Sequence, residues 1–118
     1  MNGEYLAEPM SGQIIDSDLL DMSVLVLKTL SDPARLQLLW ALCQDDRTLS
    51  ELAQQVGVTP TTASQLLTRL RGAGVLQTRK SDGHTIYAIP DERTREFIRQ
   101  TLEFAQYRLA RQADGEAS

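Results

Sequence analysis

Short polar side chains cluster in the middle of this chain in a pattern suited to recognising nucleic-acid bases. Hydroxyl and amide groups donate and accept hydrogen bonds at close range, as base edges in the major groove of DNA require. Apolar residues recur between them at three- and four-residue spacing, which predicts an amphipathic helix with an exposed polar face. The alternative is a solvated polar face beside a core, with no ligand. The predicted base-contacting residues are Thr61, Thr62, Ser64 and Gln65.

The distribution of charge favours the first interpretation. The chain of 118 residues has 16 acids and 12 bases, and its formal net charge of −4 argues against a general nucleic-acid binder. The segment Thr59–Ser81, however, contains no acidic residue, while Arg69, Arg71, Arg79 and Lys80 within it are all basic. The prediction of DNA binding therefore rests on this basic segment without acids, and not on the net charge of the chain.

Local signals place the polar face on the second helix of a helix-turn-helix. Thr59 and Pro60 are residue types that favour the N-cap and the first position of a helix. Upstream, Thr48 and Glu51 have the spacing of a capping box that opens a shorter helix, and Gly57 suits the left-handed end of that helix. Two helices joined by so short a connection are typical of a helix-turn-helix.

A hairpin is predicted immediately after this motif. Residues 75–79 and 85–89 have strand character, and Asp82-Gly83 between them is a strong hairpin signal. Arg79 and Lys80 would lie near its tip. A basic hairpin that follows a helix-turn-helix predicts a winged helix, whose wing contacts phosphates or the minor groove.

Three more helices are predicted at residues 16–30, 33–44 and about 91–111. The first is apolar almost all round, and the last carries aromatic residues opposite its main apolar stripe, so both need a second surface, most simply a dimer partner. The predicted fold is mainly α with a small β-hairpin, a winged helix-turn-helix in the order α-α-α-α-β-β-α. We expect a flexible arm at residues 1–15, a DNA-binding and dimerisation domain at 16–111 and a disordered tail at 112–118.

The sequence argues against several other classes of protein. It has no glycine-rich phosphate loop, no paired nucleophile and base, and one histidine, so we do not expect an enzyme. No apolar run reaches the length of a membrane span and no signal-peptide pattern is present, so we expect a cytoplasmic protein with no membrane partner. The single cysteine, Cys43, is interpreted as a buried structural thiol rather than a redox-reactive one. A winged helix that binds only protein is the remaining alternative, and it is consistent with the negative net charge.

Several motifs, taken in order, resemble the ArsR/SmtB family of bacterial metal- and stress-responsive repressors. They are Leu30–Leu36 (LSDPARL), Glu51-Leu52-Ala53 with Val56-Gly57-Val58, Ser64-Gln65 with Leu67 and Leu70-Arg71, Gly74-Val75-Leu76, and Gly83–Tyr87. The likeness spans residues 16–110. It implies a homodimer, joined through the first and last helices, that binds a pseudo-palindromic operator and releases it when an effector is sensed.

The resemblance also implies roles for individual residues. Thr61, Ser64 and Gln65 match the family's base-contacting positions by their place in the motif, whereas Leu66 replaces a residue that is often polar in relatives. The residues expected to contact phosphates are Thr59, Thr68, Arg69, Arg71, Arg79, Lys80 and His84. The residues expected in the dimer interface are Leu19, Leu20, Leu27, Phe104 and Tyr107.

The positions at which many relatives sense metals are altered in this chain. Those relatives use an acid and histidines of the last helix, and the matching residues here are Asp91, Arg93, Phe104 and Tyr107. Of these, Asp91 alone has a ligating side chain, and residues 47–53, where other relatives use thiolates, contain no cysteine. We therefore expect no cofactor and an effector that the sequence does not identify. The alternative is a divalent transition metal at a non-standard carboxylate and histidine site, with the candidates Asp91, His84, Asp16 and Asp18.

Overall fold

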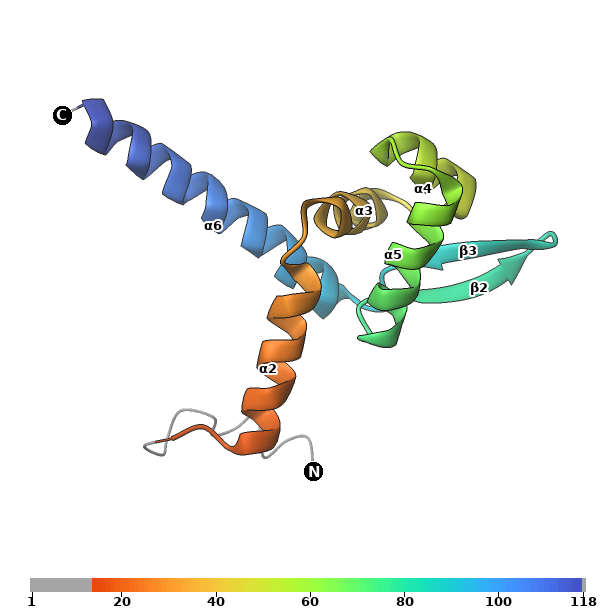
Figure 1. Ribbon diagram of the computed structural model, residues 1–118, viewed down its shortest axis with the longest axis horizontal. Helices are drawn as coiled ribbons and strands as arrows, with labels where there is room; N and C mark the ends of the chain where they lie inside the picture. Colours follow the sequence, from red (N-terminus) through yellow and green to blue (C-terminus); the bar gives the residue numbers. More distant parts are fainter. Residues whose placement is uncertain (1–13, 118) are drawn as a thin grey trace.

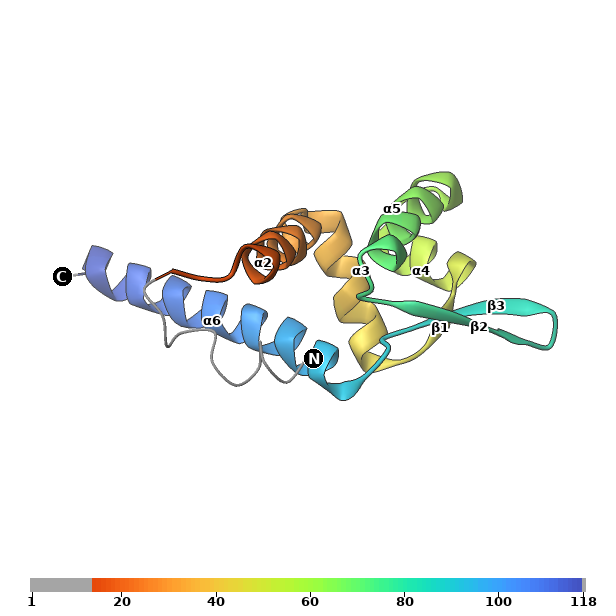
Figure 2. The same ribbon diagram turned by 90° about the horizontal axis from the view of Figure 1, so that it is seen from below.

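The computed structural model describes residues 14–117, with side chains described to residue 115. These residues form a winged helix-turn-helix. Helices α3, α4 and α5 pack beside a small sheet, while α2 and α6 project from this body (Figures 1 and 2). The predicted fold class is confirmed. The elements are α2 (Ser17–Leu30), α3 (Pro33–Gln44), β1 (Arg47–Thr48), α4 (Leu49–Val56), α5 (Pro60–Gly72), β2 (Gln77–Ser81), β3 (His84–Ala88) and α6 (Glu92–Ala117).

Helix α3 is the centre of the fold and contacts α2, α4, α5 and α6. Removing apolar surface from water is the main force that holds such small helical bodies together. None of the helices described has the length and apolar composition that a membrane span requires. The largest fully buried side chains are Leu38, Leu39, Leu42, Leu52, Leu67, Leu70 and Ile98.

A capping box, a left-handed glycine and an N-cap threonine fix the ends of α4 and the start of α5, as the sequence predicts. The backbone N–H of Glu51 donates to Thr48 Oγ1 (3.2 Å), and the backbone N–H of Thr48 donates to Glu51 Oε1 (2.8 Å). Gly57 ends α4 with a φ of +81°, a left-handed conformation that costs glycine little. Thr59 Oγ1 then accepts from the backbone N–H of Thr62 at the start of α5 (3.1 Å).

The capping box should make folding stability depend on pH through Glu51. The bond from the Thr48 backbone N–H holds the pKa of Glu51 below its ordinary value of 4.5. A carboxylate with a depressed pKa stabilises the fold above the unfolded pKa, and this stabilisation is lost as pH falls through the folded pKa. We expect the stability difference between wild type and Glu51→Ala, measured by urea unfolding, to be present at pH 7 and to shrink at pH 3. An equal difference at both pH values would contradict this.

The wing is a hairpin with a third short strand that the sequence did not predict. Strands β2 and β3 pair antiparallel up to Ser81 and His84, and Asp82 and Gly83 both have positive φ (50° and 79°), as a type I′ turn requires. The sequence signals indicate no strand before α4, but Arg47 pairs with Tyr87, and the sheet order is β1-β3-β2. Two residues are too few for strand periodicity, so pairing with β3 decides their conformation.

The structure also corrects the predicted C-terminal boundary. Helix α6 continues to Ala117, so residues 112–117 are helical and the predicted disordered tail is wrong for this segment. Extending an existing helix fixes few dihedral angles for each added hydrogen bond, and alanine, glutamine and glutamate within the segment favour it. Of the predicted flexible arm, residues 1–13 lie outside the described residues.

Candidate nucleic-acid interface

Helix α5 positions the predicted base-contacting residues by burying its opposite face. Ala63, Leu67 and Leu70 are fully buried, so the remaining positions of the helix turn outward. The exposed residues of this face include Thr61, Thr62, Ser64 and Gln65. The structure therefore brings all four predicted residues onto one exposed helix surface, whereas their contact with bases stays a prediction.

Hydrogen bonds within α5 separate the side chains that are engaged from those that can bind a ligand. The hydroxyl of Thr59 donates to Thr62 Oγ1 (3.0 Å), and the hydroxyl of Thr68 donates to the Ser64 carbonyl (2.8 Å). No hydrogen bond to the side chain of Ser64 or Gln65 occurs within the described part of the chain. The Ser64 hydroxyl and the Gln65 amide, like the hydroxyl of Thr61, are thus available to bind a ligand.

The two basic residues of the wing, Arg79 and Lys80, each contact another side chain of this protein. Arg79 Nη1 lies 2.6 Å from Asp46 Oδ2, and both side chains are partly exposed. Lys80 Nζ donates to Thr85 Oγ1 (2.7 Å), while His84 is exposed beside the turn. Exposed ion pairs contribute only about 0–1 kcal/mol, so a DNA phosphate can displace Asp46 from Arg79 at little cost. Asp46 was not among the residues predicted from the sequence.

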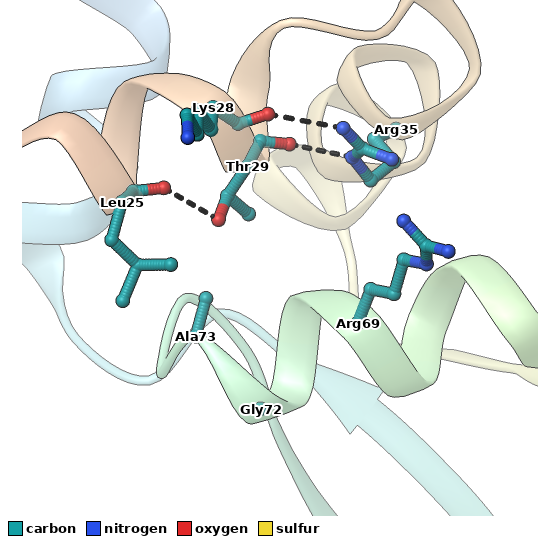
Figure 3. A pocket seen from close by; sticks show the side chains of 7 residues that line it. All are labelled: Leu25, Lys28, Thr29, Arg35, Arg69, Gly72 and Ala73. Atoms are coloured by element: carbon teal, nitrogen blue, oxygen red, sulfur yellow. Dashed lines mark hydrogen bonds between the residues drawn. The ribbon is translucent and has the colours of Figure 1, made fainter.

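Arg35 lies beside the exposed polar face of α5, although the sequence did not suggest a ligand-binding role for it. Its Nε donates to the Thr29 carbonyl (2.6 Å) and its Nη2 to the Lys28 carbonyl (3.0 Å), which fixes the guanidinium against the last turn of α2 (Figure 3). A hollow of about 600 Å³ joins Arg35 to α5. Its other lining residues are Thr62, Ser64, Gln65, Leu66, Thr68 and Arg69.

The projecting helices α2 and α6 carry the apolar side chains predicted for a dimer interface. Leu20, Leu27, Phe104 and Tyr107 are 47%, 62%, 64% and 55% exposed, and Leu19 is half-buried. The rings of Phe104 and Tyr107 contact each other with centroids 6.1 Å apart. So much exposed apolar surface on two helices is typical of a protein interface.

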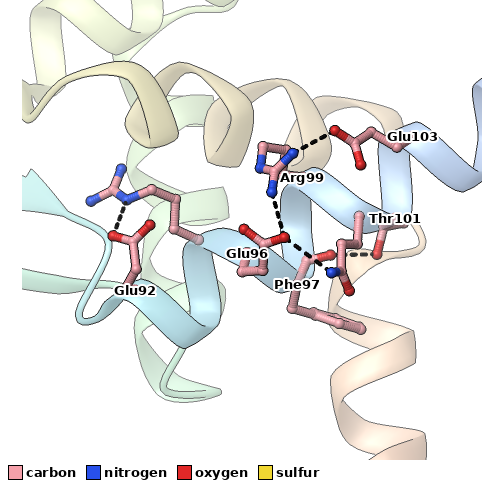
Figure 4. A network of polar contacts seen from close by, with 8 residues as sticks. Glu92, Glu96, Phe97, Arg99, Thr101 and Glu103 are labelled. Atoms are coloured by element: carbon pink, nitrogen blue, oxygen red, sulfur yellow. Dashed lines mark hydrogen bonds and ion pairs between the residues drawn. The ribbon is translucent and has the colours of Figure 1, made fainter.

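A different side of α6 is polar. Arg99 pairs with Glu96 and Glu103, and its hydrogen bond lowers the pKa of Glu96 (Figure 4). Next to these charges, α3 and α6 enclose a mainly apolar groove of about 680 Å³, lined in part by Trp40, Leu102 and Leu109.

Comparison with known proteins shows that this chain is similar to a family of bacterial regulators. Residues 32–78 match the model of the bacterial regulatory protein, arsR family. The chain is 36% identical over 85 residues to the HTH-type transcriptional regulator KmtR of Mycobacterium tuberculosis, which is 71% of this chain and 65% of that protein. It is 39% identical over 87 residues to Rv0081, an uncharacterized HTH-type transcriptional regulator of the same species, which is 71% of each chain.

A solved structure agrees with both the fold and the sequence likeness. The homodimeric winged helix-turn-helix DNA-binding domain of Mb0332 from Mycobacterium bovis superposes with a TM-score of 0.75 at 30% identity, covering 79% of this chain and 86% of that one. The chain belongs to the ArsR family. It spans slightly less than two thirds of the length of KmtR.

Two of the candidate metal ligands in this ArsR-family chain, Asp91 and Asp16, serve as helix caps. The Asp91 carboxylate accepts from the backbone N–H of Thr94 (2.8 Å), a bond that lowers the pKa of Asp91 and caps α6. Asp16 similarly accepts from the backbone N–H groups of Asp18 and Leu19. Among the side chains described, those of residues 14–115, no three or more His, Cys, Asp or Glu residues are grouped so as to hold a metal ion, so no three of the four metal candidates are brought together.

Cys43 of this ArsR-family chain lies in α3, half-buried beneath α6. Burial raises the pKa of its thiol, and the nearby Arg95 lowers it by a smaller amount. The Cys43 carbonyl accepts from Arg95 Nη1, a contact that joins α3 to α6. A thiol with a raised pKa is less often the reactive thiolate, which favours the structural role expected from the sequence.

Proposed function

We propose that this protein is a transcriptional repressor that binds a pseudo-palindromic DNA operator as a homodimer. The observation that carries the proposal is the exposed face of α5, where Ser64 and Gln65 have no internal hydrogen bond and adjoin a surface rich in arginine. Short polar groups on a helix that can enter the major groove supply base recognition, and the surrounding cations supply phosphate contacts.

The dimer places two such helices on one face of the DNA. In helix-turn-helix dimers the two reading helices lie about 34–36 Å apart, one turn of DNA, so the operator repeats with the symmetry of the protein. The exposed apolar surfaces of α2 and α6 are the surfaces that pairing would bury. Membership of the ArsR family, whose named relatives are regulators and repressors, supports the same assignment.

The proposed repressor responds to a signal other than a metal bound at the family's positions on the last helix. Asp91 is already engaged as a helix cap, and the cationic Arg93 and the aromatic Phe104 and Tyr107 offer no imidazole nitrogen. Calorimetry with Zn²⁺, Ni²⁺ and Co²⁺ tests this part of the proposal. Tight stoichiometric binding that also changes operator affinity would overturn it.

Fluorescence anisotropy with the promoter of its own operon tests DNA binding directly. We expect tighter binding to that promoter than to random DNA of the same length, with affinity that falls steeply as salt rises because bound phosphates release counterions. Equal affinities that barely change with salt would instead favour a winged helix that binds only protein.

Substituting Gln65 should separate base reading from phosphate binding. If its amide makes a bidentate contact to a base, Gln65→Ala should reduce the preference for operator over random DNA by about 1–3 kcal/mol. The matched comparison is Arg79→Ala, which should weaken binding to every sequence to a similar extent and reduce the salt dependence. Both affinities are measured by anisotropy at several salt concentrations. If the two variants lose the same amount on both DNAs, the division between reading and positioning residues is wrong.

A further inference from the structure

A pair of arginines from different helices meets at the edge of the reading face. Arg35 lies in the first turn of α3 and Arg69 in the last turn of α5, and both line two adjoining hollows of about 300 and 600 Å³. Arg69 extends from α5 toward Arg35, whose guanidinium lies against the carbonyls of Lys28 and Thr29 (Figure 3). Lys28, at the end of α2, lines the smaller hollow.

Within residues 14–115, where side chains are described, neither Arg35 nor Arg69 forms an ion pair. The acid closest in sequence, Asp32, accepts instead from the Arg35 backbone N–H (3.0 Å) and caps α3. Like charges that face each other raise the electrostatic potential between them, so an anion placed there is attracted to both.

The Arg35 guanidinium is held in place in a way that favours binding of an anion. Two of its N–H groups are held by the carbonyls of Thr29 and Lys28, so the guanidinium plane is already fixed before a ligand arrives. Less conformational entropy is then lost on binding than for a free surface arginine. Within the described side chains, its Nη1 and the guanidinium of Arg69 form no hydrogen bond or ion pair, so both can donate to phosphate oxygens.

We propose that Arg35 and Arg69 form a clamp for one phosphodiester of the operator backbone, with Lys28 at its rim. The inference rests on the proposed function and extends it, because it adds the junction of α2 and α3 to the DNA-binding surface. The clamped phosphate lies beside the bases read by Ser64 and Gln65, since these residues line the same hollow. The contact sets the register of α5 in the groove, as phosphate contacts do in other complexes.

The salt dependence of binding to the promoter tests the clamp. We expect the double variant Arg35→Gln, Arg69→Gln to reduce the slope of log K against log salt by about 0.9 unit, because the two arginines together neutralise one phosphate, and each single variant to reduce it by a smaller amount. Arg111→Gln removes the same charge from the exposed far part of α6 and should leave the slope at its wild-type value. Arg35→Lys keeps the charge and should retain most of the slope.

A second measurement uses the wild-type protein and so does not depend on the folding of a variant. We expect the Nε–H NMR signals of Arg35 and Arg69 to shift on binding the promoter duplex. Replacing the single clamped phosphate by a neutral methylphosphonate should abolish both shifts together. Two signals that never respond to the same phosphate would overturn the clamp.

The outcomes distinguish this inference from the proposed function. If wild type binds the promoter with preference and a steep salt slope, but Arg35→Gln keeps that slope, the clamp fails and the repressor assignment stands. If wild type shows no preference and no salt dependence, both fail. If Arg35→Gln weakens binding of inorganic phosphate alone while the slope for DNA is unchanged, the site takes a free anion and the clamp is overturned.

Discussion

Replacing Phe104 with glutamate is expected to convert the proposed dimer into monomers. Operator binding should then weaken by about 10²–10⁴-fold, because two linked half-site contacts become one. Phe104 is 64% exposed in the single chain and contacts the ring of Tyr107, so the substitution places a charge within the apolar surface of α6. Burying an unpaired carboxylate in an interface carries a large desolvation cost. Analytical ultracentrifugation gives the oligomeric state, and anisotropy gives the affinity.

A matched variant separates loss of the dimer from the added negative charge. Gln112→Glu introduces the same group at an exposed position of the same helix and should remain dimeric with nearly unchanged affinity. If Phe104→Glu also stays dimeric, the interface lies elsewhere and the role predicted for Phe104 and Tyr107 is wrong.

Truncating Leu67 to alanine is expected to destabilise the fold by about 2–5 kcal/mol, the range for a buried leucine that leaves a cavity. Leu67 has no exposed surface and belongs to the core that holds α5 against α3. The polar face of α5 is directed outward because this side is buried, so DNA binding should be lost together with stability. Urea unfolding at one fixed protein concentration measures the difference, since dimer stability depends on concentration.

Leu66 provides the control for this substitution. It is adjacent in sequence but only half-buried, so Leu66→Ala removes the same atoms from a site that water can partly fill and should cost less. If both variants lost the same free energy of unfolding, the buried and the half-buried side of α5 would contribute equally to stability.

Much of the reading helix could be predicted because its signals are local. Thr59 and Pro60 start α5, and Thr48 and Glu51 start α4, through bonds that span three residues or fewer. The turn at Asp82-Gly83 is equally local, since both residues supply the positive φ that it needs. Such features depend on residue type and spacing, so they can be predicted from the sequence alone.

The features that were missed depend on segments far apart in the chain. Strand β1 exists because Arg47 pairs with Tyr87, forty residues later. The contact of Arg79 with Asp46 likewise joins the wing to the segment before β1. The end of α6 was predicted too early for a different reason: polar composition alone does not distinguish a frayed tail from a continuing solvated helix.

By itself, the sequence determined the winged helix-turn-helix, its caps and the polar face of α5, because apolar periodicity and capping residues act over a few positions. Only the tertiary structure decided which cations have partners. Arg79 pairs with Asp46, whereas Arg35 is anchored to α2 beside Arg69 and pairs with no carboxylate among the described side chains. The physical reason is that charge pairing is set by distance in space, and the packing of α2, α3 and α5 brings these groups together.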